Sequence, residues 1–400
     1  MKKPILSLIL GLVLFLAGAG SWAADRTDWS QWNLLLNNNW ADYRHNFIQE
    51  DGRVIDHRIG ISTSEGQAYA MLRAVWMRDR DWFDRSYRWA VKNLQVREGD
   101  KLFAWKWGQL PDQSWGVIDN TSATDADQDI VMALLLASEI WKDDQYRTDA
   151  LAIMDSLWEK GTLSSKIGRV MMPGDWQIDG NLVQINPSYF APYAYRIFAR
   201  MDKRHPWQEL VETSYAILQK SVALNPNGLP PDWVAFNTTD GSVKLYRDAL
   251  DARSDYGYEA IRVYWRVGFD YLLNPTEKRA LTIMTASQFL PRYWIIRGDL
   301  PGATSWDGIP RKNYIESAAV YGASLMGVAH QNPEVAQDII DRRIVPNLQP
   351  GGQWNTRNDY YSQNWLWFGL ATHAIKLKKI DFPKHLSDLE RLTWVMSFEK

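Results

Sequence analysis

The chain has 400 residues, 46% of them hydrophobic and 23% charged, which is enough to bury the core of one large domain or two ordinary ones. The formal net charge of −2 gives no basic surplus that would favour nucleic acid as a partner, and it suits an uncharged substrate. There is no cysteine, which excludes disulfides, zinc–thiolate sites and thiol nucleophiles.

Residues 1–23 have the features of a secretory signal peptide. A basic start is followed by an apolar run over 5–19 and a small-x-small cleavage site at 21–23. The apolar run is short for a membrane span, and no later stretch is long enough. We therefore expect cleavage, a single catalytic domain over 24–400 that is secreted or periplasmic, and no membrane span after cleavage.

Helical patterning runs through almost all of the mature chain, because apolar residues recur at three- and four-residue spacing. The predicted helices are 29–47, 66–77, 83–94, 130–141, 146–158, 189–201, 207–222, 260–272, 277–289, 314–327, 334–344, 361–377 and 386–396. Strand signals are confined to two short ribbons, 169–172 and 243–246. The pattern predicts an all-α fold, a closed ring of about six helical hairpins, with 130–137 apolar enough for an inner helix.

Three aspartates alternate in residues 122–130, which read SATDADQDI. Asp125, Asp127 and Asp129 fit the acidic first turn of a helix, where the exposed amides and the helix dipole favour carboxylates. A calcium loop is excluded, because Ile130 and Leu136 stand where such a loop needs glycine and glutamate. At least one catalytic or ligand-holding aspartate here is an equally good interpretation.

A second carboxylate, Glu65, lies in the segment 62–71, which reads STSEGQAYAM. Its spacing from Ser62 matches a capping box, in which the glutamate only satisfies its own helix start. Gly66 favours a functional role for this segment, because a glycine in the first turn weakens a helix. Its presence is explained if another group must approach the backbone closely there. Both interpretations stay open from the local sequence.

Glu259 and Arg262 are three residues apart and would share a helix face. A surface ion pair is the simple explanation. The surroundings are unusual for a solvated pair, because four aromatic residues flank it: Tyr256, Tyr258, Tyr264 and Trp265.

Other catalytic machinery finds no support in the sequence. The six histidines lack metal-ligand spacing, and there is no nucleophile elbow, phosphate loop or dinucleotide motif, so neither metal nor cofactor is expected. Carboxylate chemistry remains, and two carboxylates suffice to cleave a glycosidic bond. The 22 tryptophans fit this chemistry, because some of them could stack on sugar rings in a groove.

Seven stretches, in the expected order, together resemble glycoside hydrolase family 8, which contains bacterial endoglucanases, xylanases and chitosanases. They are GRVID (52–56), TSEGQAYAM (63–71), FAWKWG (103–108), SATDAD (122–127), NPSY (186–189), PDWV (231–234) and YEAIRVYWR (258–266). The likeness is greatest to secreted endoglucanases that accompany bacterial cellulose synthases. It implies an (α/α)6 barrel and hydrolysis with inversion.

The resemblance also implies roles for individual residues. Glu65 matches the general acid, and Asp125 matches the aspartate that holds the distorted sugar. Tyr189 matches a tyrosine that helps place the water, and Arg262 a substrate-side arginine. Trp105 matches a sugar-stacking tryptophan.

Two further tryptophans, Trp107 and Trp176, are expected to contact substrate as well. The partners implied are a β-1,4-linked polysaccharide and the cellulose synthase machinery.

The chain departs from the family at the general base. The family has aspartate in its Tyr-Asp-Ala-x-Arg stretch, and this chain has Glu259 there. Glu259 would act as the base with its longer side chain set back to leave room for water; the alternatives are Asp255 as base, or weak or lost activity. A non-catalytic polysaccharide-binding or scaffold protein therefore stays open, as do xylan, mixed-linkage glucan or chitosan as the substrate of an active enzyme.

Overall fold

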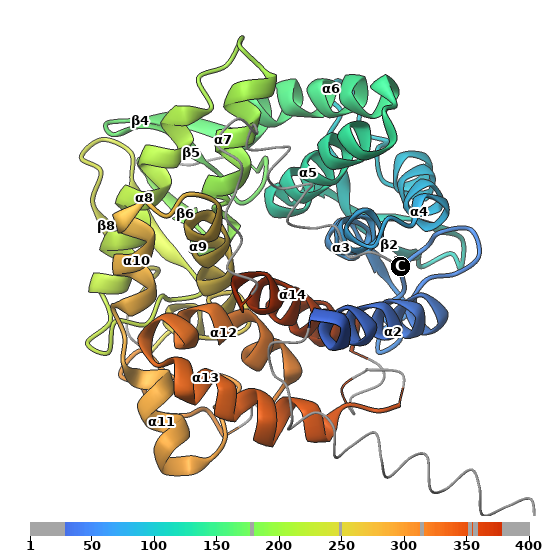
Figure 1. The fold of residues 1–400 in the computed structure, drawn as a ribbon. Coiled ribbons are helices and arrows are strands. Elements are labelled where there is room, and N and C mark those ends of the chain that lie inside the picture. Colours follow the sequence, from blue (N-terminus) through green and yellow to red (C-terminus); the bar gives the residue numbers. More distant parts are fainter. Residues whose placement is uncertain are drawn as a thin grey trace, which may run out of the picture.

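The helices form a closed ring in which inner and outer helices alternate, an (α/α)6 barrel (Figure 1). The computed structural model describes residues 29–176, 180–247, 250–312, 316–350, 354 and 359–377. The predicted signal peptide at 1–23 and the predicted helix at 386–396 lie outside these residues.

The order of the helices follows the predicted hairpin rhythm. They are α2 (Trp29–Phe47), α3 (Ser64–Trp76), α4 (Arg80–Asn93), α5 (Thr124–Trp141), α6 (Asp144–Gly161), α7 (Pro192–Met201), α8 (Gln208–Ala223), α9 (Ile261–Leu273), α10 (Lys278–Thr285), α11 (Phe289–Arg297), α12 (Ala318–Gln331), α13 (Pro333–Ile339) and α14 (Tyr360–Leu377). Short 3-10 turns precede α7 (η1, Pro187–Tyr189) and α9 (η2, Ala252–Ser254).

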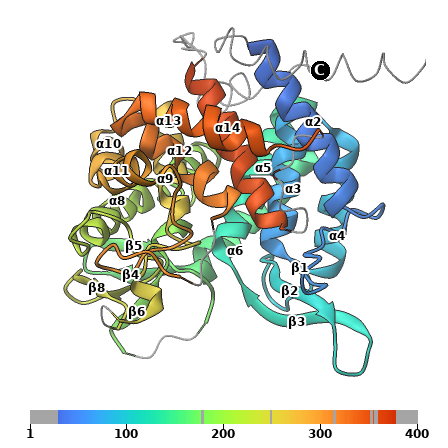
Figure 2. The ribbon, with the colours of Figure 1, turned by 90° about the horizontal axis from the view of Figure 1, so that it is seen from below.

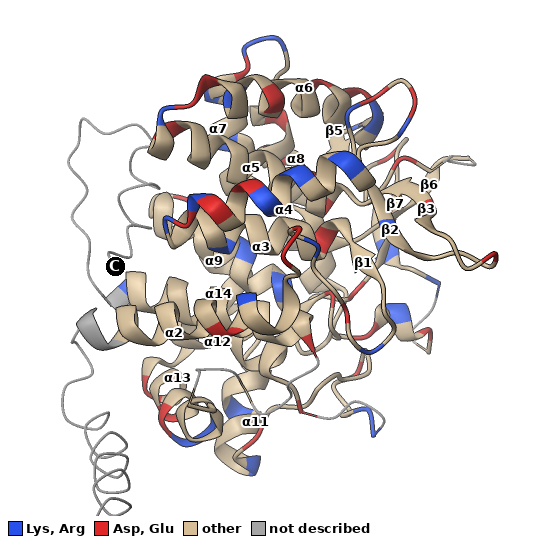
Figure 3. Ribbon diagram, turned by 90° about the vertical axis from the view of Figure 1, so that its right-hand side faces the viewer, with Lys and Arg blue, Asp and Glu red and all other residues tan. Residues whose placement is uncertain are grey.

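The inner helices are apolar on most sides because neighbours surround them. Residues 130–137 of α5 are all buried, which confirms the prediction of an inner helix there. Helices α12 and α14 approach most closely at Gly322 and Gly369, where a Cβ on Gly369 would lie 2.0 Å from the Gly322 carbonyl oxygen. Outer helices such as α4 carry acidic and basic side chains on their exposed side (Figure 3).

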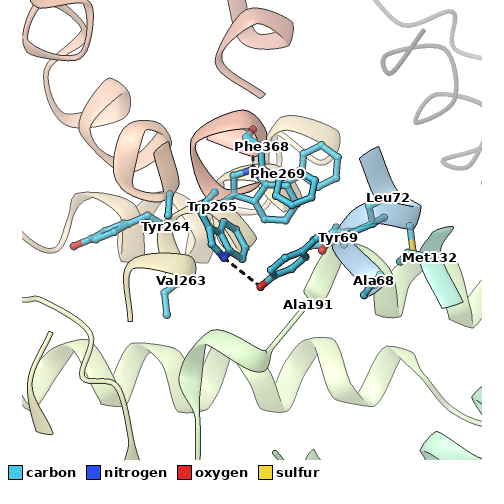
Figure 4. Packing of buried hydrophobic residues seen from close by; sticks show 14 of the residues in the cluster. Ala68, Tyr69, Leu72, Met132, Ala191, Val263, Tyr264, Trp265, Phe269 and Phe368 are labelled. Carbon is cyan, nitrogen blue, oxygen red and sulfur yellow. Dashed lines mark hydrogen bonds between the residues drawn. The ribbon is translucent and has the colours of Figure 1, made fainter. Parts of the chain in front are cut away.

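Aromatic rings from α3, α9 and α14 pack against one another in the core (Figure 4). Trp265 stacks on Phe269 with ring centroids 5.1 Å apart, and Phe368 lies 5.5 Å from Trp265 and 5.6 Å from Tyr69. The Tyr69 hydroxyl accepts a hydrogen bond from Trp365 at 3.2 Å, so this polar group is satisfied in the core. Most of the 22 tryptophans are accordingly explained by packing.

The strands lie together at one end of the barrel (Figure 2). They are β1 (Ser62–Thr63), β2 (Ala104–Gln109), β3 (Trp115–Ser122), β4 (Thr162–Ser165), β5 (Gly168–Met171), β6 (Leu182–Ile185), β7 (Val234–Asn237) and β8 (Val243–Leu245). The two predicted ribbons correspond to β5 and β8. The projecting β2–β3 hairpin was not predicted, because its irregular register hides the two-residue period of a strand.

Two predicted helices are interrupted. The predicted helix 189–201 begins only at Pro192, because the residue before a proline avoids the helical conformation and Ala191 is therefore not helical. The predicted helix 277–289 ends at Thr285, and α11 begins separately at Phe289. Among the described residues, no helix is both long and apolar enough to span a membrane.

Candidate active site

A cleft of about 420 Å³ opens at the end of the barrel where inner helices α3, α5 and α14 begin. Its lining is Arg58, Thr63, Ser64, Glu65, Trp105, Ala123, Asp125, Tyr189, Tyr258, Glu259, Asp359, Tyr360 and Tyr361. Each of these inner helices contributes side chains from its first turn. Helix N-termini carry unpaired amides and partial positive charge, so carboxylates gather at this end favourably.

Glu65 lies in the first turn of α3, but it does not cap the helix. Thr63 is the N-cap, and its Oγ1 accepts a hydrogen bond from the Gly66 amide at 3.0 Å. Glu65 instead accepts hydrogen bonds from the Tyr360 hydroxyl (2.9 Å) and from Arg262 (3.1 Å). The capping interpretation of Glu65 was therefore wrong.

Gly66 allows this arrangement. A Cβ at Gly66 would lie 3.3 Å from the ring of Tyr360 and 3.3 Å from Val54. The close approach expected from the glycine is thus made by Tyr360.

The three aspartates of α5 point to three different partners. Asp125 faces the cleft and accepts a hydrogen bond from Arg262 at 2.9 Å. Asp127 accepts the Phe103 amide at 3.0 Å, and Asp129 binds Arg266 through both carboxylate oxygens, at 2.5 and 2.8 Å. Only Asp125 is therefore placed for contact with a ligand in the cleft.

Arg262 joins the carboxylates. Its Nη1 donates to Glu65 and Asp125, and its Nη2 donates to Glu259. The Arg262 side chain is 1% exposed, whereas those of Glu65 and Glu259 are 22% and 35% exposed. One buried guanidinium thus holds three carboxylates that all line the cleft, and two of them, Glu65 and Glu259, are partly exposed.

Glu259 has a second partner that the sequence analysis did not identify. Asn186 Nδ2 donates to Glu259 Oε2 at 2.8 Å, and Asn186 is itself fully buried. Asn186 Oδ1 accepts the Ser188 amide and hydroxyl, which orients its NH₂ group toward Glu259. One oxygen of Glu259 is therefore anchored by Arg262 and Asn186 together. No hydrogen bond joins Glu259 and Glu65 within the described part of the chain.

Asp232 supports the backbone around Glu259. Its Oδ1 accepts the amides of Gly257 (3.0 Å), Glu259 (3.2 Å) and Ala260 (2.7 Å), just ahead of α9. Burial raises the pKa of Asp232 to about 7, against the effect of these amides. The motif PDWV was recognised in the sequence, but nothing in it indicated that its aspartate would orient Glu259.

The charge balance of the cluster favours a bound proton. Burial raises the pKa of Glu65; Arg262 lowers this pKa and Asp125 raises it further. Burial raises the pKa of Asp125 as well, against Arg262. A single guanidinium cannot neutralise three carboxylates, so one of them is best accommodated as the neutral acid.

Tyrosines complete the wall around the carboxylates. Tyr189 places its ring 5.2 Å from the Arg262 guanidinium. Tyr361 lines the cleft and donates its hydroxyl to the Tyr258 carbonyl. Burial raises the pKa of both Tyr189 and Tyr361 well above the ordinary tyrosine value, so both remain neutral. Tyr189 was expected here from the family resemblance, whereas Tyr360 and Tyr361, in the first turn of α14, were not predicted to line the cleft.

Of the three expected substrate tryptophans, only Trp105 lines the cleft. Trp107 lies in a different hollow, stacked on Trp115 with centroids 5.2 Å apart. Trp176 is partly exposed and packs against Gly174, away from the cleft lining. The prediction that Trp107 contacts substrate beside Trp105 was therefore wrong for this cleft, because the register of β2 shifts between Lys106 and Trp107 and the two rings line different hollows.

Asp255, the alternative base, does not line the cleft. Arg311 donates hydrogen bonds to both oxygens of Asp255, at 2.8 and 2.7 Å, and the Asp255 side chain is buried. The structure thus gives Asp255 an ion pair away from the cleft. Elsewhere Asp155, Asp202 and His205 could offer metal ligands, but Arg204 already binds both aspartates there.

The fold and the site together define an (α/α)6-barrel protein with an acidic, aromatic-lined cleft. The family model for glycosyl hydrolases family 8 matches residues 22–365, so the chain belongs to this family. An endoglucanase of Pseudomonas fluorescens is 34% identical over 268 residues, 65% of this chain and 64% of the relative. The chain thus spans just under two thirds of that relative's length.

Solved structures agree with the family. An endo-1,4-D-glucanase from Vibrio fischeri matches with a TM-score of 0.71 at 27% identity, covering 84% of this chain and 94% of that chain. An endo-beta-1,4-glucanase from Acetobacter xylinum matches with a TM-score of 0.67 at 26% identity, covering 86% and 99%.

Proposed function

We propose that the chain is a secreted or periplasmic inverting endo-β-1,4-glucanase that hydrolyses cellulose-like β-glucan in this cleft. The observation that carries the proposal is the placement of Glu65, Asp125 and Glu259 on the single guanidinium of Arg262, at the wall of an open cleft. The family and the endoglucanase names of its relatives support the reaction class.

Glu65 is the general acid. Burial raises its pKa, which keeps a proton available for the leaving glycosidic oxygen. Tyr360 and Arg262 fix the two carboxyl oxygens, so the proton is presented in a defined direction.

Glu259 is the general base. Asn186 and Arg262 bind one of its oxygens, which leaves the other able to accept a proton from water. An inverting pair is separated by about 6.5–9.5 Å so that this water fits between base and sugar. The water attacks the anomeric carbon from the face opposite the bond that Glu65 protonates.

Asp125 and Trp105 bind the substrate. Asp125 is held by Arg262 and by the Ala126 amide (2.9 Å), which aims a rigid acceptor at the sugar hydroxyls in the cleft. Trp105 offers an aromatic face to a neighbouring ring.

The variant Glu65→Gln tests the assignment. Turnover on soluble β-glucan should fall by about 10²–10⁴-fold, because proton donation is lost while the side chain keeps its shape. Thermal unfolding of the variant checks that the fold is retained. Near-normal activity would end the role of Glu65 as acid. Proton NMR of the first-formed anomer tests inversion separately, and release of the retained anomer would overturn it.

A non-catalytic polysaccharide-binding protein is the second candidate, favoured by one observation. Glu259 replaces the family's aspartate and lies against Arg262, which could hold its carboxylate too firmly to act as a base. Binding without release of reducing ends from glucan, xylan and chitosan would support this candidate over the enzyme.

A further inference from the structure

A second hollow of about 440 Å³ lies where the β2–β3 hairpin meets helix α4, outside the candidate cleft. None of its lining residues lines the cleft. The two share only strand β2, which gives Trp105 to the cleft and Trp107 to the hollow. Figure 2 shows this hairpin projecting from the barrel.

Two tryptophans form a platform in the hollow. The rings of Trp107 and Trp115 are stacked, 5.2 Å apart and inclined by 25°. Trp115 is 51% exposed, so part of its ring surface is open to a ligand. The buried guanidinium of Arg53 lies 4.6 and 4.7 Å from the two rings and is fixed by Ser62 Oγ (2.8 Å) and the Gly60 carbonyl (2.9 Å). The platform is therefore rigid before any ligand arrives.

Cationic side chains surround the platform. Arg88 and Lys92 are exposed and four residues apart on α4, a spacing at which like charges repel each other. Within the described part of the chain, neither makes an ion pair or a side-chain hydrogen bond. With Arg53 they give the hollow three cations against one carboxylate, Asp51, although the whole chain has a net charge of −2. An anionic ligand would relieve this local repulsion.

We infer that this hairpin site (Arg53, Arg88, Lys92, Trp107 and Trp115) binds a polysaccharide whose pyranose rings carry carboxylate groups. A sugar ring stacks on the exposed face of Trp115, and its carboxylate pairs with Arg88 and Lys92. The site differs in ligand from the cleft, where an acidic wall suits a neutral chain. A nucleic acid fits less well, since three cations are few for a phosphate backbone and the chain has no basic surplus.

The experiment compares binding of the full chain to polygalacturonate, an acidic pyranose polymer, and to neutral hydroxyethylcellulose, by affinity gel electrophoresis. Trp115→Ala and the double variant Arg88→Gln/Lys92→Gln should each weaken polygalacturonate binding by about fivefold or more and leave hydroxyethylcellulose binding unchanged. Added salt should weaken polygalacturonate binding selectively. The double variant changes exposed residues only, so it tests the site even if Trp115→Ala fails to fold.

A matched control removes two exposed cations elsewhere, Arg147→Gln/Lys160→Gln on α6, with the same change in net charge. An equal loss in this control would assign the effect to overall charge and overturn the site. Absence of polygalacturonate binding by the unaltered chain, or stronger competition by a single-stranded oligonucleotide than by the polymer, would also overturn it. The inference does not rest on the proposed hydrolysis, which is measured separately on hydroxyethylcellulose.

Discussion

Helices α5 and α9 are joined by two arginine–aspartate pairs that look alike in sequence. Asp125 pairs with Arg262 at the cleft, and Asp129 pairs with Arg266 one helical turn deeper. The spacing is four residues on each helix, and both arginines are 1% exposed. Their surroundings are nevertheless different.

The deep pair is balanced and closed. Both Asp129 oxygens accept hydrogen bonds from Arg266, and the Tyr193 hydroxyl accepts a further one from the same guanidinium. The outer pair has two extra carboxylates, Glu65 and Glu259, and opens to the cleft. Charge balance and access thus separate a pair that holds the fold from one that is placed for acid–base chemistry.

The largest effect is expected at the outer pair, where the carboxylates line the cleft. Glu259→Gln should lower kcat on soluble β-glucan by about 10²–10⁴-fold, because the base is lost while its size is kept. In Glu259→Asp the side chain is one methylene shorter, so its carboxylate lies farther from Arg262. The kcat of this variant should stay within about tenfold of that of the unaltered chain. Thermal unfolding provides the control for folding. Full activity of Glu259→Gln would show that another group is the base.

Changes to the deep pair, Asp129 and Arg266, should affect the stability of the fold. Asp129→Asn leaves the buried Arg266 without its counter-charge, so the free energy of unfolding should fall by about 3–5 kcal/mol in urea titrations. The double variant Asp129→Leu/Arg266→Met removes both charges and should recover most of this loss. An unchanged urea midpoint for Asp129→Asn would contradict a structural role for the pair.

A smaller effect is expected when only the hydrogen bond from Tyr360 to Glu65 is removed. A general acid works while protonated, so activity is lost as pH rises through its pKa; burial raises the pKa of Glu65, which places this alkaline limb above the ordinary glutamate range. The Tyr360 hydroxyl stabilises the ionised form of Glu65, so Tyr360→Phe should raise the pKa of Glu65 further.

The pH profile of kcat/KM measures this. The alkaline limb of Tyr360→Phe should move to higher pH, and its plateau should fall by less than about tenfold. If the alkaline limb stays in place or moves to lower pH, the Tyr360 hydroxyl does not lower the pKa of Glu65 as proposed.

The smallest effect is expected at Gly66. Alanine there gains up to about 1 kcal/mol of helix propensity but crowds Tyr360 and Val54, at 3.3 Å each. Stability should therefore change by no more than about 1 kcal/mol, while displacement of Tyr360 lowers kcat about two- to fivefold. Serine at this position, slightly larger, should lower kcat further; equal activity of all three would show that the close approach is not needed.

Much of the fold could be predicted from the sequence. Helical periodicity identified most of the helices, and the continuous apolar run at 130–137 identified an inner one. The β2–β3 hairpin was not predicted because its tryptophans are half-buried in β2 and exposed in β3, so hydrophobicity does not alternate with burial along these strands. Pro192 could have corrected the start of α7.

The candidate site could be predicted only in part. Glu65, Asp125, Tyr189, Glu259 and Arg262 meet as expected from the family resemblance. Local sequence alone could not separate Asp125 from Asp127 and Asp129, since an acidic first turn places each of them favourably. The supporting residues are distant along the chain from the glutamates they contact. Asn186 and Asp232 are 73 and 27 residues from Glu259, and Tyr360 is 295 residues from Glu65. No local sequence pattern predicts these contacts.

By itself the sequence determined the helical ring and the supply of carboxylates, because periodic burial and helix-start chemistry act between near neighbours. The tertiary structure decided which carboxylates share one guanidinium. Glu65 and Arg262 are 197 residues apart, and Asp125 and Arg262 are 137 apart. Such contacts depend on how the ring closes, so the same Asp–Arg spacing gives an open acidic cluster at the cleft and a closed ion pair one turn below.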